Sequence, residues 1–442
     1  MLSENLIKLY ESSFRNNWNH IALSDYFKDD TFTYGQMAEE IARLHLLFEQ
    51  LKIKKGDKIS LIGRNNTRWC ITYIATITYG AVIVPILQDF NPNDVQHIIN
   101  HSDSVLLFAG EMYWESIEES KVKNIRAVIS LEDFSPLYER SGKTVSDFFL
   151  QANKLMKKKY PKGFTPTDIK YSDRKSNDVV LINYTSGTTG FSKGVMLTVN
   201  NLTGNILLGI RTNLHFPGSR ALSFLPLAHA YGCMFDFLMP LCVGTHITLL
   251  GKIPSPKVLL DALAKVKPHL INCVPLILEK VYRKQILPQL DKPLLKLITK
   301  VPILDTVVYM SIKNKLVTAF GGELEQIIIG GAPLNKEVEE FLYKINFPFT
   351  VGYGMTECGP LISYTHWKEF VPTSCGKILD GLMEVKIDSP DPYKIPGEIR
   401  VRGEHVMTGY YKNPEATNAV LRDGWLYTGD MGTISSNETI FI

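Results

Sequence analysis

Cysteine is scarce in this chain and is not arranged in pairs. The 442 residues include six cysteines, and no two of them form a C-x-x-C pair. A disulfide framework or a structural zinc site is therefore not expected, and a reducing, cytoplasmic environment fits best. The first residues are mixed in polarity and lack the pattern of a secretory signal peptide.

An excess of charge of either sign is also missing. The chain has 48 lysines and arginines against 45 aspartates and glutamates, which gives a formal net charge of +3. The most noticeable basic run, residues 157–159, is a lysine triplet of the kind that usually forms a solvated surface. Nucleic-acid binding is therefore not expected.

No apolar stretch has the length and continuity of a membrane span. The longest, residues 71–87, is uncharged but contains threonine, tyrosine, Gly80 and Pro85. This composition favours a buried helix followed by a core strand over a transmembrane helix. No transmembrane segment is predicted, while peripheral membrane contact through another surface stays open.

The first third of the chain alternates between helical and strand patterns. Hydrophobic residues make up 45% of the sequence, enough for a large core, and the length suggests two or three domains. Residues 33–50 have helical spacing, residues 94–100 begin a short helix, and strands are predicted at 58–62, 81–85 and 104–108. This alternation predicts α/β layers with a parallel or mixed sheet.

A second α/β run follows a lysine-rich stretch, residues 154–176, which is interpreted as a surface connection. Its strands are predicted near residues 179–183, 221–225, 246–250, 270–273 and 326–329. After about residue 350, short alternating runs such as 383–387 and 398–402 are broken by glycine and proline, which suggests a smaller β-rich subdomain. The predicted fold is α/β, with layered, helix-flanked subdomains at 1–175 and 176–349 and a β-rich, distorted-barrel subdomain at 350–442.

A loop of glycines, hydroxyl residues and one lysine follows strand-forming residues at 185–194, with the sequence TSGTTGFSKG. Glycine lets successive N–H groups converge on an anion, hydroxyls add donors, and Lys193 adds a positive charge. No Walker A pattern can be read here, so a P-loop kinase or helicase is poorly supported. An ordinary surface turn is the alternative, but the combination favours phosphate binding. The candidate phosphate ligands are Thr185, Ser186, Gly187, Thr188, Thr189, Gly190 and Lys193.

Residues 184–195, YTSGTTGFSKGV, resemble the signature of the adenylate-forming superfamily. That superfamily contains acyl-CoA synthetases, adenylation domains of peptide synthetases and firefly-type luciferases. The resemblance begins near residues 32–35, FTYG, and continues to the C-terminus through several motifs in the family's order. It implies an enzyme that uses ATP to activate a carboxylic acid.

The hexapeptide GYGMTE at residues 352–357 offers an aromatic face, a hydroxyl and a carboxylate. Taken alone, it fits a turn with a core tyrosine and a solvated glutamate. The resemblance implies instead that Tyr353 stacks on adenine, that Thr356 contacts the α-phosphate, and that Glu357 coordinates Mg²⁺. The same motif adds three further nucleotide-binding candidates: Gly352, Gly354 and Met355.

Two more motifs complete the expected nucleotide site. In YTGD, residues 427–430, an aspartate would more often cap a turn, but the resemblance makes Asp430 the ribose ligand. In GGAPL, residues 330–334, small residues after a strand leave room for a planar ring. The resemblance assigns this adenine side to Gly331, Ala332 and Pro333.

A single histidine stands in LPLAHAYG, residues 225–232, where a satisfied core histidine would be the ordinary interpretation. The resemblance implies that His229 lies beside the acyl carboxylate and covers it. A general base is not needed, because a carboxylate is already ionised near neutral pH. The implied catalytic residues are Lys193, His229, Thr356 and Glu357, and the implied acyl-pocket residues are His229, Gly232, Val274, Gly331 and Gly352.

The resemblance implies a fatty acid–CoA ligase of the AMP-forming type. Residues 403–415, GEHVMTGYYKNPE, are more similar to fatty acyl-CoA synthetases than to amino-acid-activating domains. The expected reaction joins a medium- or long-chain fatty acid to AMP with Mg²⁺ and releases pyrophosphate, after which coenzyme A takes the acyl group. Two alternatives stay open: a ligase that loads an acyl carrier protein, and, for this chain, a nucleotide-binding module with little activity.

The family pattern continues past residue 442 with a hinge and a small mobile C-terminal domain that carries a lysine used in adenylation. These parts are absent from the 442 residues. The expectation is therefore that this chain binds ATP or acyl-adenylate, adenylates acids weakly, and forms little thioester.

Overall fold

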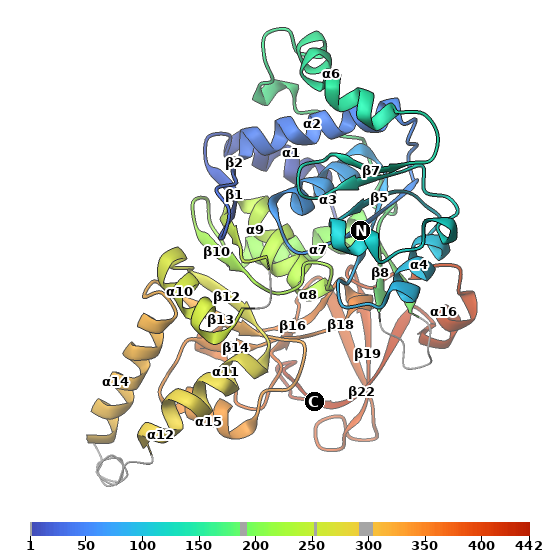
Figure 1. Ribbon diagram of the computed structural model, residues 1–442. Helices are drawn as coiled ribbons and strands as arrows, with labels where there is room; N and C mark the ends of the chain where they lie inside the picture. Colours follow the sequence, from blue (N-terminus) through green and yellow to red (C-terminus); the bar gives the residue numbers. More distant parts are fainter. Residues whose placement is uncertain (1, 186–191, 252–253, 291–303) are drawn as a thin grey trace.

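The computed structural model describes residues 2–185, 192–251, 254–290 and 304–442 (Figure 1). An eight-stranded sheet forms the first layer. Its inner strands are parallel, and antiparallel strands close both ends. In spatial order the strands are β20 (Gly409–Tyr410), β9 (Lys193–Thr198), β8 (Val179–Thr185), β4 (Val82–Ile86), β3 (Lys58–Ile62), β5 (Ser104–Ala109), β6 (Ala127–Ser130) and β7 (Pro136–Glu139).

Helices cover both faces of this sheet, which explains why its central strands are apolar at nearly every position. Every residue of β4 is buried. The helices α2 (Tyr34–Gln50) and α3 (Thr67–Tyr79) pack on one face, and α4 (Pro92–His101) packs on the other. The predicted buried helix and core strand within residues 71–87 are therefore confirmed as α3 and β4.

A seven-stranded sheet forms the second layer. Its strands run parallel, apart from an antiparallel hairpin at one edge. In spatial order they are β14 (Phe349–Val351), β13 (Gln326–Ile329), β12 (Leu270–Cys273), β10 (Arg220–Ser223), β11 (His246–Leu249), β1 (Ile21–Asp25) and β2 (Thr31–Thr33). The predicted strands at 270–273 and 326–329 are confirmed as β12 and β13, with the predicted first and last residues.

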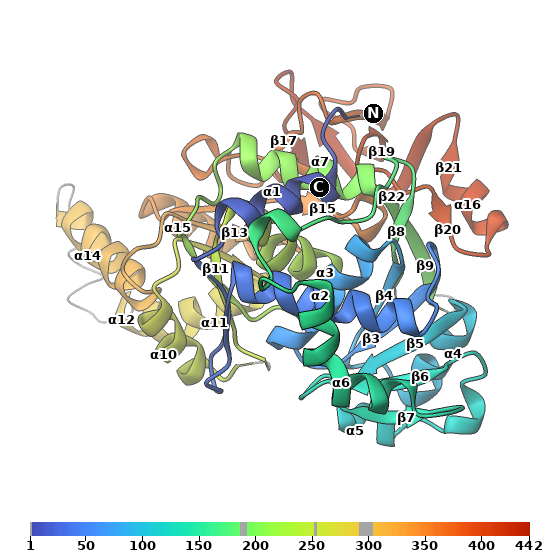
Figure 2. The same ribbon diagram turned by 90° about the horizontal axis from the view of Figure 1, so that it is seen from above.

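The two sheets exchange strands along the chain. β8 and β9 follow residue 175 but pair into the first sheet beside β4 (Figure 2), while β1 and β2 come from the N-terminal region and join the second sheet (Figure 1). A cut at residue 175 would separate strands from their sheets. The division at residues 175 and 349 stays a prediction.

The last part of the chain is a curled, antiparallel β region, drawn in orange and red in Figure 1. One small sheet holds β15 (Tyr353–Gly354), β16 (Leu361–Tyr364) and β17 (Lys377–Ile378). The other holds β18 (Met383–Asp388), β19 (Gly397–Gly403), β22 (Trp425–Ile434), β21 (Leu421–Arg422) and β23 (Ile440–Phe441). The predicted class, layered α/β subdomains with a smaller β-rich one, is confirmed.

Local sequence signals explain where helices begin. Thr33 caps α2, since its Oγ1 accepts a hydrogen bond from the Gln36 N–H and the Gln36 side chain accepts one from the Thr33 N–H. The other helices are α1 (Leu6–Asn16), α5 (Glu111–Glu115), α6 (Thr144–Lys159), α7 (Val199–Arg211), α8 (Ala230–Cys233), α9 (Met239–Val243), α10 (Pro256–Val266), α11 (Pro275–Val281), α12 (Leu287–Leu290), α14 (Leu304–Ala319), α15 (Lys336–Lys344) and α16 (Pro414–Val420). Short 3₁₀ segments are η1 (Glu119–Lys121), η2 (Pro166–Asp168), η5 (Thr356–Cys358) and η6 (Trp367–Glu369), and π-helical segments are η3 (Met234–Leu238) and η4 (Tyr282–Ile286).

The surface connection predicted at residues 154–176 is wrong at its start. Helix α6 continues through Lys159, because Ala152 and Met156 lie one helical turn apart and pack into the core. The lysine triplet occupies the exposed last turn of that helix. The described residues contain no helix of the length and apolarity that a membrane crossing requires. A cytoplasmic location stays a prediction.

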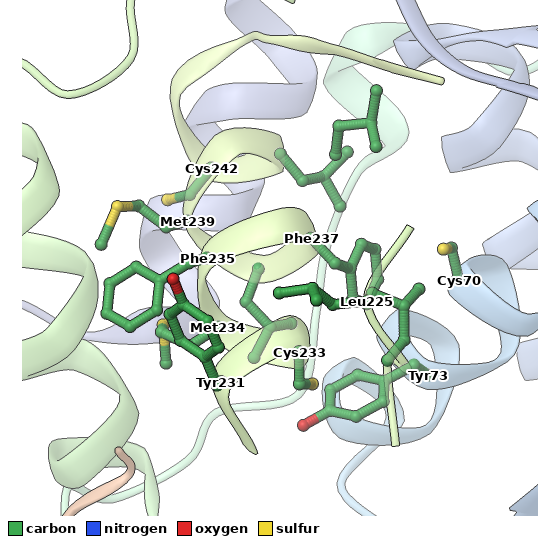
Figure 3. Packing of buried hydrophobic residues seen from close by; sticks show 14 of the residues in the cluster. Cys70, Tyr73, Leu225, Tyr231, Cys233, Met234, Phe235, Phe237, Met239 and Cys242 are labelled. Carbon is green, nitrogen blue, oxygen red and sulfur yellow. The ribbon is translucent and has the colours of Figure 1, made fainter. Parts of the chain in front are cut away.

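Aromatic side chains join the two α/β layers in the core (Figure 3). Phe237, from η3, makes edge contacts with Trp69 and Tyr73 of α3, at ring-centroid distances of 6.0 and 5.7 Å. All three side chains are buried. The π-helical segment η3 joins α8 to α9, so this cluster fixes the helix that His229 caps against the first layer.

Replacing Phe237 with alanine tests this contact. The change would remove a buried ring between layers, and we expect the free energy of unfolding to fall by about 3–5 kcal/mol in urea denaturation. Leu150→Ala is the control: Leu150 is 85% exposed, so its loss should change stability by less than about 0.5 kcal/mol. Equal effects of the two variants would contradict the described packing.

Candidate active site

The site lies where parallel strands of the seven-stranded sheet end. The Gly330 N–H, just after β13, donates to the Cys273 carbonyl at the end of β12 (3.2 Å). The Gly352 N–H, just after β14, donates to the Ile329 carbonyl at 2.9 Å. The carboxyl ends of such strands are where open α/β sheets bind ligands, because the chain turns away there and leaves a crevice.

A pocket with a mixed polar and apolar lining opens on one side of this strand edge. It brings together residues that the sequence predicted for adenine and ribose, and its lining includes Gly331, Ala332, Pro333, Gly352, Tyr353 and Asp430. The Tyr353 hydroxyl donates to Asp430 Oδ2 at 2.6 Å. Burial and then the hydrogen bond to Asp430 raise the pKa of Tyr353, so the hydroxyl keeps its proton.

Two contacts shape this pocket further. The Asp430 N–H donates to Thr428 Oγ1 at 3.1 Å, which helps to fix the Asp430 backbone within strand β22. Gly331 has a φ of 84°, a conformation that other residues rarely adopt, so the chain can bend back beside the pocket.

An apolar pocket lies on the other side of the same edge. Its lining includes His229, Tyr231, Phe235, Leu214 and Tyr364, together with Met355 and Thr356. Four residues line both pockets and separate them: Gly331, Gly352, Tyr353 and Gly354. We call these four residues the shared wall. Three of these four residues are glycines, so the wall between the two pockets is thin. At Gly354 a side chain would collide with the Pro360 carbonyl oxygen.

His229 begins helix α8 at the mouth of the apolar pocket. Its Nδ1 accepts a hydrogen bond from the Tyr231 N–H at 3.3 Å, which caps the helix. The imidazole keeps contact with solvent, yet the surrounding protein removes enough water to lower the pKa of His229. A neutral histidine that caps a helix can shape the pocket without serving as a base.

Two predicted acyl-pocket residues lie apart from the lining. Gly232 lies in α8, where an added β-carbon would collide with the Pro226 carbonyl oxygen, and it lines neither pocket. Val274 also lines neither, but its side chain would be 3.8 Å from a β-carbon on Gly331. Their part in acyl binding stays a prediction.

The predicted phosphate-binding end of the site is described only in part. Of the predicted loop, Ser186, Gly187, Thr188, Thr189 and Gly190 lie outside the described residues. Thr185 ends β8 and pairs with Lys193, the first residue of β9. The Lys193 ammonium lies 5.2 Å from the ring centre of Tyr410. Thr356 and Glu357 stand in the short turn η5.

Glu357 suits a magnesium ion that is shared with phosphate. Its Oε1 accepts a hydrogen bond from the Tyr410 hydroxyl at 2.8 Å. Within the described ranges, no three or more acidic, histidine or cysteine side chains gather as a metal cage. Mg²⁺ is commonly bound through one or two carboxylates plus substrate phosphates, so this single carboxylate fits it.

The AMP-binding enzyme family matches residues 10–411. This chain belongs to that family. Long chain acyl-CoA synthetase 6, peroxisomal, of Arabidopsis thaliana is 30% identical to it over 435 residues, which cover 90% of this AMP-binding enzyme and 59% of the relative. Long-chain-fatty-acid–CoA ligase 5 of Rattus norvegicus is 27% identical, with 93% and 63% covered. The chain therefore spans about three fifths of the length of these relatives.

Relatives of other specificity and solved structures extend the comparison. The 4-coumarate-CoA ligase 1 of Narcissus pseudonarcissus is 27% identical, with 95% of this chain and 71% of the relative covered. The N-terminal domain of FACL13 from Mycobacterium tuberculosis has a TM-score of 0.76 at 19% identity, with 99% of each chain covered. ATP-bound MatB from Rhodopseudomonas palustris has a TM-score of 0.76 at 21% identity, covering 99% of this chain and 78% of that one. The two structures show that the fold is shared.

Sequence reasoning missed a buried acid behind the apolar pocket. Asp236 lies in η3, where its Oδ1 accepts a hydrogen bond from Asn272 Nδ2 at 2.9 Å and its Oδ2 one from the Leu225 N–H at 3.4 Å. It thereby ties the segment before His229 to strand β12. Burial raises the pKa of Asp236 to about 7. The sequence feature that could have indicated this buried acid is the single aspartate within the otherwise apolar residues 233–243.

Asp236→Asn should remove a pH dependence of stability. The folded state holds this proton up to about pH 7, whereas an unfolded aspartate releases it near pH 4. The free energy of unfolding of the unmodified chain should therefore fall relative to the variant as pH rises through this window. Urea denaturation at pH 5 and pH 8 should show an extra loss of roughly 2 kcal/mol in the unmodified chain. Parallel pH profiles would contradict the buried acid.

Proposed function

We propose that this AMP-binding enzyme holds the ATP and acyl sites of an acid–thiol ligase. The reaction converts a medium- or long-chain fatty acid to its acyl-adenylate and releases pyrophosphate, and in the whole protein coenzyme A then takes the acyl group. One observation carries the proposal: an apolar pocket and the mixed pocket that contains Asp430 share the wall of Gly331, Gly352, Tyr353 and Gly354. An acyl chain in the first and adenosine in the second would meet at that wall.

The chemistry fits such a meeting point. A carboxylate oxygen attacks the α-phosphorus of ATP and forms a new P–O bond, while the bond from that phosphorus to the bridging oxygen breaks and pyrophosphate leaves. No proton has to be removed, because the acid is already ionised. The protein has to align the two reactants and to neutralise the phosphate charge.

Each candidate residue has a role in this scheme. Lys193 neutralises phosphate charge, the Thr356 hydroxyl donates a hydrogen bond to the α-phosphate, and Glu357 holds Mg²⁺. When bound, that ion polarises the phosphate oxygens. The ring of Tyr353 stacks on adenine, and the Asp430 carboxylate accepts hydrogen bonds from the ribose hydroxyls. His229 covers the reacting carboxylate, and its neutral state avoids a competing charge.

The lining of the apolar pocket favours a fatty acid over an amino acid. Leu214, Tyr231 and Phe235 offer apolar surface, and among the described residues that line this pocket none carries an acidic side chain for an α-amino group. Relatives named for long-chain acids support the same choice. A relative named for 4-coumarate makes an aromatic acid the comparison to include.

Binding of stable acyl-adenylate mimics tests the proposal without requiring turnover. Sulfamoyl adenosines that carry acetyl, octanoyl, palmitoyl, 4-coumaroyl or leucyl groups would be titrated into the chain by calorimetry. We expect affinity to rise with the length of the fatty chain, by up to about tenfold for every two buried methylenes. Equal affinity across the panel, or a preference for the leucyl compound, would contradict a fatty-acid site.

Lys193→Ala tests the phosphate end. Loss of the ammonium should weaken ATP binding about tenfold, the effect of removing one charge-assisted contact, while the melting temperature changes little. Lys158→Ala, in the exposed last turn of α6, removes a lysine far from the site and should bind ATP normally. An ATP affinity that is unchanged by Lys193→Ala in calorimetry would remove the assignment.

A further inference from the structure

Tyr410 lies outside the motifs that were predicted to bind nucleotide, yet it contacts two of the predicted residues. Its hydroxyl donates to Glu357 Oε1 at 2.8 Å, and the Lys193 ammonium stands 5.2 Å from its ring centre. The side chain is 6% exposed. The Met407 N–H also donates to the Glu357 carbonyl at 2.8 Å, so the segment before Tyr410 holds the Glu357 backbone as well.

The backbone of Tyr410 is fixed on two sides. On one side β20 pairs with β9, which places Tyr410 opposite Val195, two residues after Lys193. On the other side the Tyr410 N–H donates to Thr417 Oγ1 at 2.9 Å. The Thr417 hydroxyl in turn donates to the Asn413 carbonyl at 2.8 Å. The phenol therefore projects from a strand that is clamped between β9 and α16.

We propose that Tyr410 is a positioning residue that holds Glu357 for a phosphate-bound magnesium ion and holds Lys193 for the phosphates. This inference rests on the proposed function. The hydroxyl binds one oxygen of the carboxylate and leaves the other for the cation. The ring attracts the Lys193 ammonium through its electron-rich face. One side chain thus orders a negative and a positive group of the same site.

The need for such a residue follows from the composition of the site. A lone carboxylate on a flexible side chain loses rotational freedom when it binds a metal ion, at a cost that neighbouring ligands cannot share. No further cage of metal ligands surrounds Glu357 within the described residues. A hydrogen-bond donor in a fixed position orders the carboxylate before the cation binds, as the outer contacts of metal ligands do in other metal sites. The carboxylate then loses less rotational freedom when the cation binds.

The test compares two neighbouring tyrosines in the full chain. Tyr410→Phe removes the hydroxyl and keeps the ring, so the variant should fold. Tyr411→Phe is the matched control, because the Tyr411 hydroxyl also donates to a carboxylate, Asp103 Oδ2, at 2.9 Å, but outside the site. ATP binding would be measured by calorimetry over a range of MgCl₂ concentrations, and Mn²⁺ binding to the ATP complex by electron paramagnetic resonance.

We expect Tyr410→Phe to raise the Mg²⁺ concentration for half-maximal ATP binding about tenfold. ATP binding without metal should stay unchanged, and Tyr411→Phe should match the unmodified chain. In a Glu357→Gln background, Tyr410→Phe should have no further effect, since the carboxylate it positions is gone. Tyr410→Leu, which removes the ring as well, should also weaken metal-free ATP binding through Lys193.

The failure of this inference can be told from failure of the proposed function. Mg²⁺-dependent ATP binding that is equal in the unmodified chain and in Tyr410→Phe would overturn the role of Tyr410 alone. The role of Tyr410 would also be overturned if Tyr410→Phe still raised the Mg²⁺ concentration for half-maximal ATP binding tenfold in the Glu357→Gln background. Absence of ATP binding by the unmodified chain would overturn the proposed function and the role of Tyr410 together.

Discussion

The close approach of backbone at the ends of β13 and β14 is the constraint on which the site depends. Small residues after these strands let two pockets share one thin wall, so that an apolar and a polar ligand half can meet. A side chain on Gly354 would collide with the Pro360 carbonyl oxygen, and Gly331 bends with a φ of 84°. The crevice lies where the parallel strands of the seven-stranded sheet end, and Gly331 and Gly354 let the backbone segments around it approach closely.

The β-rich region completes the site from the other side. Two side chains from the last part of the chain reach residues that follow β14: Asp430 of β22 binds the Tyr353 hydroxyl of β15, and Tyr410 of β20 binds the Glu357 carboxylate of η5. Both contacts join a phenol to a carboxylate, and both orient groups that are proposed to bind ligand. Strands β22 and β20 therefore brace the segment that follows the parallel strand β14, which ties the fold of the last part of the chain to the candidate site.

Local patterns in the sequence predicted the strands at 270–273 and 326–329, whereas the site motifs around Tyr353 and Asp430 were proposed from the family resemblance. Local patterns could not predict which strands exchange between sheets, because pairing of β1 with β11 joins residues more than 200 positions apart. The contact of Tyr410 with Glu357 was missed for the same reason, since it spans 53 positions. Helix α6 is longer than its lysine-rich end suggested, because Ala152 and Met156 pack against the core.

Mapping where an acyl chain lies would test the central claim most directly. A palmitoyl sulfamoyl adenosine with a photoreactive diazirine near the middle of the chain would be bound, irradiated and located by mass spectrometry. We expect labels on residues that line the apolar pocket, such as Leu214 or Phe235, and we expect ATP to compete with the labelling. Labels that fall elsewhere on the molecule, or that ATP does not reduce, would contradict a shared wall between acyl and nucleotide sites.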